Sequence, residues 1–436
     1  MTELPPTLVG LQQAFKRGAL SHAEAIAAQR QRMERLDGRF HAVTQMLPSP
    51  ALCPKKGRLA GVGLAHKDIF NTSARTPGVG HDRGSAAPGL QPASVLARLD
   101  AEGASDLATL SMTQYACGAT GDNDRFERCV NPLRAEAVVG GSSSGSAVAV
   151  AAHMAYGSLG TDTAGSVRIP AATCGVLGLK TTHGLIARDG VYPLAPTLDS
   201  VGLLTRSAAD AMEILQACAR PGQLRSPATA SLRIKAWIPD RELDESVASA
   251  LGAFADACQA TTRIRQWTGH AALTQLAEIV LHAESAQTHR QALLDASCSP
   301  SVQAVALAGL VIPRKWHEAA IADRARRARE FVAEHLLAHD VFLLPALPDP
   351  VPDWIDVTPG HAAFNAKRLL GMHRYMGFVN YLGLPSLVMP VATDTRGLPI
   401  SVQLVARPFH ESLLLGFAHR HELRLSVDHV VAQPFS

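Results

Sequence analysis

The sequence contains few cysteines and no cysteine pair with the spacing of a metal or redox motif. Its seven cysteines are scattered along 436 residues without a C-x-x-C pair. A disulfide framework or a structural zinc site would need an ordered, closely spaced set. Gly78-x-Gly80 opens no helical pattern, so it is not a dinucleotide fingerprint. We therefore expect free thiols, a reducing cytoplasm, no metal and no cofactor.

An excess of charge of one sign is also missing. The chain has 41 basic and 38 acidic residues and a net charge of +3. This near balance gives no reason to expect a nucleic-acid partner or a membrane surface. The densest basic run, Arg324, Arg326, Arg327 and Arg329, lies in a helical pattern. We interpret it as a solvated helix face.

Long hydrophobic runs are absent as well. No stretch approaches the roughly 18 uninterrupted apolar residues of a membrane-spanning helix. The longest run of small apolar residues, 147–152, ends at His153 and predicts a buried helix. The first residues show no basic segment followed by an apolar one, so we expect no signal peptide.

The remaining pattern alternates helices with buried strands. A hydrophobic fraction of 47% and a charged fraction of 18% are typical of a globular protein with a large core. Amphipathic periodicity predicts two helices in the first 45 residues, the second opened by a Ser21–Glu24 capping box. Further helices are predicted at 207–219, 244–260 and 317–339, and strands at 61–70, 341–344, 387–391 and 400–405.

These elements predict an α/β protein with a large mixed sheet covered by helices on both faces. No Pro/Ser-rich linker and no internal repeat divides the chain. We therefore expect a single domain over residues 1–436, with a helical lobe at roughly 205–335 packed on the sheet. Residues 77–201 are rich in Gly, Ser, Thr and Pro and predict a loop-rich active region.

Two glycine- and serine-rich segments stand out in that region. Residues 140–146 read G-G-S-S-S-G-S, and residues 160–170 read G-T-D-T-A-G-S-V-R-I-P. Small side chains let backbone N–H groups approach a ligand and bind a developing negative charge. One such segment could be a flexible loop. Two of them, together with a strand that ends in Lys67-Asp68, indicate a catalytic site.

These residues resemble the amidase signature family, whose hallmark is a GGSS-type loop followed by T-D-x-G-S-x-R-x-P. The resemblance spans roughly residues 55–425 and implies the amidase signature fold. It also covers residues 61–68, residues 174–180 (C-G-V-L-G-L-K), residues 198–206 (L-D-S-V-G-L-L-T-R), residues 383–385 and residues 397–403.

The resemblance implies a Ser–cis-Ser–Lys triad. Ser166 would be the nucleophile, Lys67 the base, and Ser142, after a cis peptide bond from Gly141, the proton relay. The oxyanion hole would consist of the backbone N–H groups of Thr163, Ala164, Gly165 and Ser166.

The chemistry agrees with these residue types. A serine hydroxyl becomes a good nucleophile only when a base removes its proton. Lysine can do so when burial lowers its pKa from about 10.4 toward roughly 7–8. Ser142 could pass the proton because a hydroxyl both donates and accepts.

The sequence also departs from the family pattern. Ser144 and Ala164 stand where glycine is usual, but both are small and keep the backbone N–H. Thr181 stands where proline often follows the lysine at position 180. Residues 106–112 replace a Gly-Lys-Thr-Asn stretch, a difference that concerns the substrate-side wall and not the triad.

Other residues are further candidates. Residues 141–145 also match G-x-S-x-G, which would make Ser143 the nucleophile of an α/β-hydrolase. Under the amidase interpretation, Ser143 lies behind the site or helps to bind substrate. Arg168 could bind a substrate carboxylate or hold the active loop. Three more arginines could recognise an acidic substrate end, namely Arg125, Arg128 and Arg188.

Three functions are compatible with this pattern. The first is an amidase that acts alone on a small carboxamide or ureido substrate and could form a homodimer. The second is an amidotransferase subunit that works only in an assembly; such a subunit is expected to have a longer C-terminal part than the residues after Pro345. The third is a catalytically silent relative, which the intact Lys67, Ser142 and Ser166 argue against.

Overall fold

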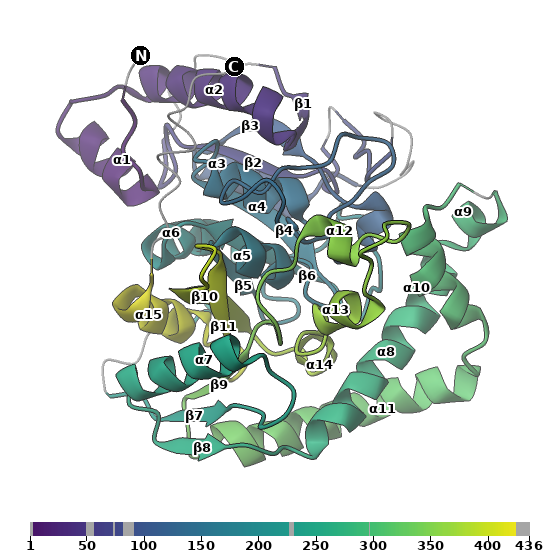
Figure 1. Ribbon diagram of the computed structural model, residues 1–436. Helices are drawn as coiled ribbons and strands as arrows, with labels where there is room; N and C mark the ends of the chain where they lie inside the picture. Colours follow the sequence, from purple (N-terminus) through teal and green to yellow (C-terminus); the bar gives the residue numbers. More distant parts are fainter. Residues whose placement is uncertain are drawn as a thin grey trace.

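The structure is a computed structural model, and it describes residues 3–48, 56–72, 75–81, 91–225, 231–295 and 297–423. A small N-terminal sheet with helices lies against a larger mixed sheet, as Figure 1 shows. The remaining helices surround both sheets and extend to one side as a group formed by α8 (Gly269–Thr288), α10 (Pro300–Leu310) and α11 (Arg314–Phe331).

The N-terminal part begins with the two expected helices, α1 (Leu8–Lys16) and α2 (His22–Phe40). The Ser21 hydroxyl accepts from the Glu24 N–H, and the Glu24 carboxylate accepts from the Ser21 N–H, so the predicted capping box is confirmed. The small sheet has the order β1-β3-β2, in which β2 and β3 are parallel. Its strands are β1 (Val43–Met46), β2 (Gly63–Lys67) and β3 (Ser105–Leu110).

The large sheet has eight strands in the order β4-β6-β5-β10-β11-β9-β7-β8. Only β7 with its neighbours β8 and β9 pairs in parallel; the other neighbours are antiparallel. The expected mixed sheet is therefore confirmed. Its strands are β4 (Gly157–Asp162), β5 (Leu177–Lys180), β6 (Ser200–Thr205), β7 (Ile234–Trp237), β8 (Thr262–Ile264), β9 (Val341–Pro345), β10 (Ser386–Thr393) and β11 (Pro399–Val405).

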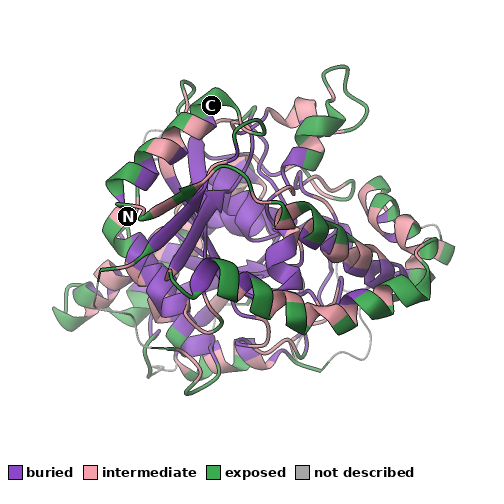
Figure 2. Ribbon diagram, turned by 90° about the horizontal axis from the view of Figure 1, so that it is seen from below, coloured by how far each residue is buried: buried purple, intermediate pink, exposed green. Residues whose placement is uncertain are grey.

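Helices cover both faces of this sheet. Successive strand residues point to opposite faces, and along β10 Leu387 and Met389 join one apolar cluster while Val388 joins another. The first cluster includes residues of α6 (Ala208–Cys218), α7 (Glu245–Ala257) and α15 (Glu411–His421). The second includes residues of α4 (Ser144–Ala151) and α5 (Arg168–Cys174). In Figure 2 the strands are accordingly buried between helices whose outer faces are exposed.

The structure bears out one expectation about the middle of the chain and corrects another. The segment 77–201 is rich in loops, as predicted: it supplies α4, α5, β4 and β5, but residues 117–143 contain no helix or strand. Its glycines reflect close packing: a Cβ on Gly157 would lie 2.3 Å from Ile214 Cδ1, and one on Gly160 would lie 2.6 Å from Ser143 Oγ. The range 205–335 is not wholly helical, since it contributes β7 and β8 to the large sheet.

The other elements are helices. The predicted helix at 317–339 begins earlier, at Arg314, and its last turn is a π-helix. The remaining helices are α3 (Ser94–Ala101), η1 (Gln114–Ala116), α8 (Gly269–Thr288), α9 (Arg290–Leu294), α10 (Pro300–Leu310), α11 (Arg314–Phe331), η2 (Val332–Leu336), α12 (Trp354–Val357), α13 (Ala366–Gly371) and α14 (Gly377–Tyr381).

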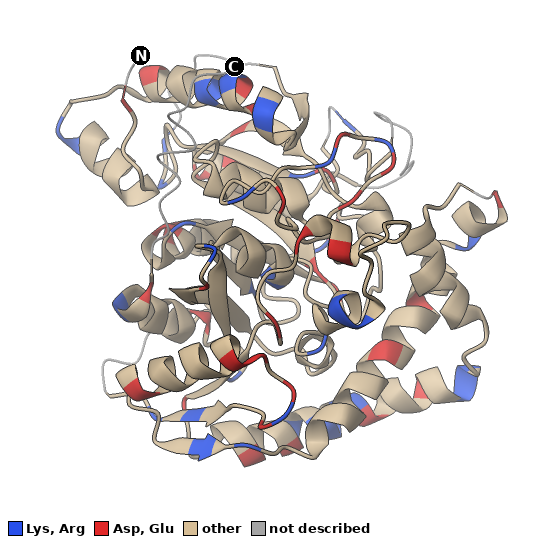
Figure 3. Cartoon of the chain, viewed as in Figure 1, with Lys and Arg blue, Asp and Glu red and all other residues tan. Residues whose placement is uncertain are grey.

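The charges of α11 are mixed along the helix (Figure 3). Arg326 and Arg327 pair with Asp323, as expected of a solvated face. Arg324 differs, because its guanidinium donates to the Thr197 carbonyl and lies over the Tyr381 ring.

Six cysteines are buried free thiols, and Cys53 lies outside the described residues. Within the described ranges, no helix is long and apolar enough to cross a membrane, and no cluster of side chains could hold a metal ion.

Candidate active site

The three predicted catalytic side chains come from three separate elements that meet. Lys67 ends β2, Ser142 lies just before α4, and Ser166 lies in the turn between β4 and α5. Their exposed fractions are 1%, 0% and 6%. The two serine loops are joined because the Ser143 N–H donates to the Ser166 carbonyl at 3.1 Å.

Lys67 is held by two hydroxyl groups. Its Nζ donates to Ser142 Oγ at 2.7 Å and to Thr161 Oγ1 at 2.9 Å. Burial lowers the pKa of Lys67 to about 7, although Asp199 and Asp162 act in the opposite direction. A fraction of this lysine is therefore neutral at pH 7 and able to accept a proton. Sequence reasoning missed Thr161, which follows Gly160 in the second glycine-rich segment.

A neighbouring loop fixes the backbone around Ser142. The Thr113 N–H donates to the Ser142 carbonyl at 3.3 Å, and the Gly141 N–H donates to the Ala119 carbonyl at 2.7 Å. The peptide bond between Gly141 and Ser142 is cis. Gly140 has a φ of +78°, a conformation that glycine adopts without strain.

The hydroxyls of Ser142 and Ser166 are not hydrogen-bonded to each other within the described part of the chain. Hydrogen bonds between catalytic groups often tighten only when substrate is bound. Ser166 is the more exposed of the two, so it is the serine that a ligand can reach.

Asp162 organises the turn that carries Ser166. Its carboxylate accepts from the backbone N–H groups of Gly165 at 2.9 Å and Val167 at 3.1 Å. Burial alone would raise the pKa of Asp162, but the Arg168 guanidinium holds it well below its usual range. The turn is therefore built around a permanent negative charge.

This arrangement changes the predicted oxyanion hole. The N–H of Gly165 is already bound to Asp162, so Gly165 is removed from the set of donors. The N–H groups of Thr163, Ala164 and Ser166 have no partner among the described residues. They remain the candidate donors to a substrate oxyanion.

Arg168 is fully buried at 0% exposure. Its guanidinium binds Asp162 through Nε at 3.0 Å and Nη2 at 2.8 Å, and it also donates to Gln403 and Asn380. With these donors occupied inside the protein, the geometry favours holding the active loop over meeting a substrate carboxylate.

Asp199 supports the other end of the turn, and sequence reasoning did not single it out. Thr163 Oγ1 donates to Asp199 Oδ1 at 2.6 Å, and the N–H groups of Leu194 and Ala195 also bind this carboxylate. Burial raises the pKa of Asp199 to about 6. This carboxylate is the largest of the influences that keep the pKa of Lys67 from falling further.

His373 is a second residue that the sequence did not indicate. Its Nδ1 lies 3.0 Å from the Ala164 carbonyl, which can only accept, so Nδ1 carries the proton. Burial lowers the pKa of His373. A neutral imidazole thus holds the carbonyl of the turn.

The other predicted residues lie away from the reacting hydroxyls or have other partners. Ser143 is fully buried, and its Oγ faces the Thr161 carbonyl at 3.4 Å, which gives no support for a nucleophile. Arg128 lies over the Trp354 ring, Arg188 donates to the Pro196 carbonyl, and Arg125 is exposed.

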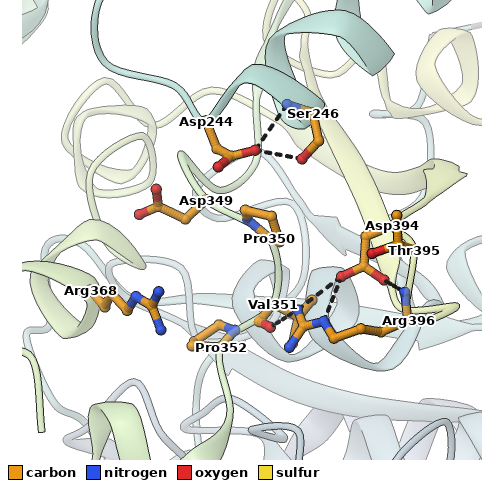
Figure 4. A pocket seen from close by; sticks show the side chains of 10 residues that line it. All are labelled: Asp244, Ser246, Asp349, Pro350, Val351, Pro352, Arg368, Asp394, Thr395 and Arg396. Carbon is orange, nitrogen blue, oxygen red and sulfur yellow. Dashed lines mark hydrogen bonds and ion pairs between the residues drawn. The ribbon is translucent and has the colours of Figure 1, made fainter. Parts of the chain in front are cut away.

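A separate hollow of about 300 Å³ lies beside the turn that follows β10 (Figure 4). Arg396 there is bound to Asp394, and Asp244 caps α7 through Ser246. None of the predicted site residues lines it.

Known proteins are similar to this chain over most of its length. The family model Amidase matches residues 13–255 and 242–415. A glutamyl-tRNA(Gln) amidotransferase subunit of Geobacter metallireducens is 28% identical over 95% of this chain and 96% of that protein. AtzE, a 1-carboxybiuret hydrolase subunit of Pseudomonas sp. strain ADP, is 31% identical over 82% of each chain.

A solved structure is similar to this chain as well. The crystal structure of an amidase superposes with a TM-score of 0.84 at 26% identity, covering 96% of this chain and all of that one.

Proposed function

The chain belongs to the amidase family and is an amide-cleaving hydrolase, and we propose that it cleaves a small carboxamide or ureido substrate through an acyl-enzyme on Ser166. The observation that carries this proposal is the hydrogen bond of 2.7 Å from Lys67 Nζ to Ser142 Oγ. It joins a buried amine whose pKa is about 7 to a hydroxyl that lies beside the nucleophile turn.

In the proposed acylation step, Ser166 Oγ attacks the carbonyl carbon of the substrate. Its proton passes to Ser142, which gives its own proton to Lys67 Nζ. The N–H groups of Thr163, Ala164 and Ser166 stabilise the oxyanion that forms. The relay then runs backwards and protonates the leaving nitrogen, so the C–N bond breaks and Ser166 keeps the acyl group.

In the deacylation step, water takes the place of Ser166 as nucleophile. The same relay removes its proton and then returns it to Ser166 Oγ, so the C–O bond to Ser166 breaks and the acid is released. Thr161, Asp199 and Asp162 have supporting roles, because they hold Lys67 and the turn in position. No step needs a group that the chain does not itself carry, other than water.

Replacing Ser166 by Ala tests the proposal. We expect hydrolysis of a panel of small mono- and diamides, ureido acids and aryl amides to fall to background. The circular dichroism spectrum and melting temperature should stay unchanged. Ser143→Ala is the matched control and should keep most activity, because Ser143 lies behind the turn. Full activity in Ser166→Ala would reject the proposal.

A second candidate function is an amidotransferase or hydrolase subunit within an assembly. The match over 95% of this chain to a protein named as an amidotransferase subunit favours it. That match covers 96% of the relative, so a missing C-terminal part does not argue against this role as the sequence had suggested.

Size-exclusion chromatography of the purified chain, combined with activity assays, separates the two candidates. We propose an active homodimer. Activity that appears only after a partner protein is added would favour the assembly.

A further inference from the structure

Three buried polar side chains near Ser142 lack a nitrogen or oxygen partner among the described residues. They are the hydroxyls of Thr113 and Ser285 and both ring nitrogens of His289. Their exposed fractions are 1%, 0% and 1%. A buried polar group without a partner costs about 1–3 kcal/mol. The Cys117 thiol is a hydrogen-bond partner of Ser285, so Thr113 and His289 are the groups that the fold leaves without a partner among the described residues.

These groups lie where the C-terminal end of α8 meets the loop that holds Ser142. Thr113 belongs to that loop and donates its N–H to the Ser142 carbonyl. Ser285 lies against the Cys117 thiol, which is close enough to Lys67 to influence its pKa. His289 follows Ser285 by four residues, so both side chains share one face of the helix.

Aromatic rings lie beside these polar groups. We call the surface formed by Thr113, Ser285, His289, Tyr115 and Tyr192 the wall. The ring centroids of Tyr115 and His289 are 4.8 Å apart, and those of Tyr115 and Tyr192 are 5.6 Å apart with nearly parallel planes. Tyr115 and Ala116 have φ angles of +51° and +61°, which are unfavourable for side chains of this kind. Strained backbone of this type concentrates at sites that bind ligands.

We propose that Ser285 and His289 recognise the part of the substrate beyond the scissile bond, and that this part is a neutral planar carboxamide or ureido group. The inference rests on the proposed amidase function and narrows its substrate class. A neutral imidazole offers one N–H donor and one lone pair, and a serine hydroxyl offers both. They match the NH₂ and C=O groups of a carboxamide, whose flat face suits the rings of Tyr115 and Tyr192.

The charge around His289 selects a neutral group over a carboxylate. Burial lowers the pKa of His289 to about 4, so the ring is uncharged near pH 7. A substrate carboxylate would have to be buried here without a cation, which is strongly unfavourable.

Three isosteric probes test this inference: malonamide, 3-methylbutanamide and malonamate. They present a carboxamide, an isopropyl group and a carboxylate at the same distance from the scissile amide. We expect kcat/KM to be highest for malonamide. His289→Phe keeps the ring contact with Tyr115 and should reduce the malonamide to 3-methylbutanamide ratio by about 10-fold or more, since a site built for hydrogen bonds discriminates strongly.

His335→Phe is the matched control. His335 is also fully buried among aromatic rings, but it contacts Trp267 and Phe342. Its replacement should change the melting temperature without changing the ratio. An equal ratio in wild type and His289→Phe, or a preference for malonamate, would overturn the inference and leave the amidase function intact.

Binding of malonamide to Ser166→Ala, measured by calorimetry, separates the two proposals. If no amide is hydrolysed by the wild type, the proposed function fails. The wall is then judged by binding alone. Weaker binding by about 10-fold or more in the double variant Ser166→Ala/His289→Phe supports it, and unchanged or absent binding rejects it.

Discussion

Lys67 Nζ donates a hydrogen bond of 2.7 Å to Ser142 Oγ, and neither residue is more than 1% exposed. A charged amine in such a place would be costly, so burial lowers the pKa of Lys67 to about 7. The resulting neutral fraction is what a base needs. The same burial destabilises the fold, because the amine of Lys67 has to be removed from water.

Lys67→Met is therefore expected to separate activity from stability. The variant should lose at least about 1,000-fold in kcat/KM, because the base of the relay is gone. It should also melt at a higher temperature at pH 7, because no amine has to be buried. Both quantities can be measured on one preparation, with assays and differential scanning calorimetry. A lower melting temperature would contradict the assigned burial cost.

The pH profile of kcat/KM should report the protonation of Lys67. Below its pKa the lysine is protonated and cannot act as base, so activity is expected to rise with pH and level off above about 7. Stability should follow the same direction. The unfolded chain binds a proton at Lys67 up to its ordinary pKa, so between that value and about 7 this residue makes the fold less stable as pH falls.

Asp199→Asn tests the carboxylate that has the largest influence on the pKa of Lys67. Asparagine can still accept the hydrogen bond from Thr163 Oγ1, so the change removes charge but keeps the contact. Without that negative charge the pKa of Lys67 falls further. The rise of kcat/KM with pH, which we call the acid limb, should then occur at lower pH. Asp244→Asn, at an exposed helix cap, is the control and should leave the limb in place.

Thr161 is expected to position Lys67. Thr161→Val has a similar shape but loses the 2.9 Å hydrogen bond to Nζ. We expect kcat to fall by about 10-fold or more with little change in KM, because a hydrogen bond to a charged group contributes about 1.5–3 kcal/mol. Thr161→Ser should keep most of the activity. Equal losses in both variants would show that packing, and not the hydroxyl, matters.

The ion pair of Arg168 and Asp162 is expected to hold the fold as well as the turn. Arg168→Met leaves a buried carboxylate without its cation, which typically costs about 3–5 kcal/mol. Urea unfolding should show this loss. Arg314→Ala removes an exposed pair with Glu318 and should change the free energy of unfolding by about 0.5 kcal/mol or less.

Some parts of the fold were predictable because their sequence pattern is local. The runs at 341–344, 387–391 and 400–405 are apolar and bounded by Pro or Gly, and they lie in β9, β10 and β11. The strand β4 was missed because its pattern, G-S-L-G-T-D, has a single large apolar residue, Leu159. Its small side chains make room for Ser143 and Ile214. The strand β8 has three residues, of which Thr262 and Arg263 are polar, so no periodicity could reveal it.

Some residues of the candidate site were also predictable from a local sequence pattern, and others were not. Lys67, Ser142 and Ser166 lie in motifs that resemble a known family, so the sequence indicated them directly. Thr161 lies within one of these motifs, and strand alternation could have placed it opposite Asp162. His373 could not be found, because its contact with Ala164 joins segments far apart in the chain.

The central claim is that Ser166 carries the acyl group. The most direct measurement is rapid acid quenching during the first turnover of an activated anilide, followed by intact-mass and peptide mass spectrometry. We expect one acyl adduct, on the peptide that contains Ser166, and none in Ser166→Ala. An adduct on Ser142 or Ser143, or full turnover without any adduct, would contradict the account.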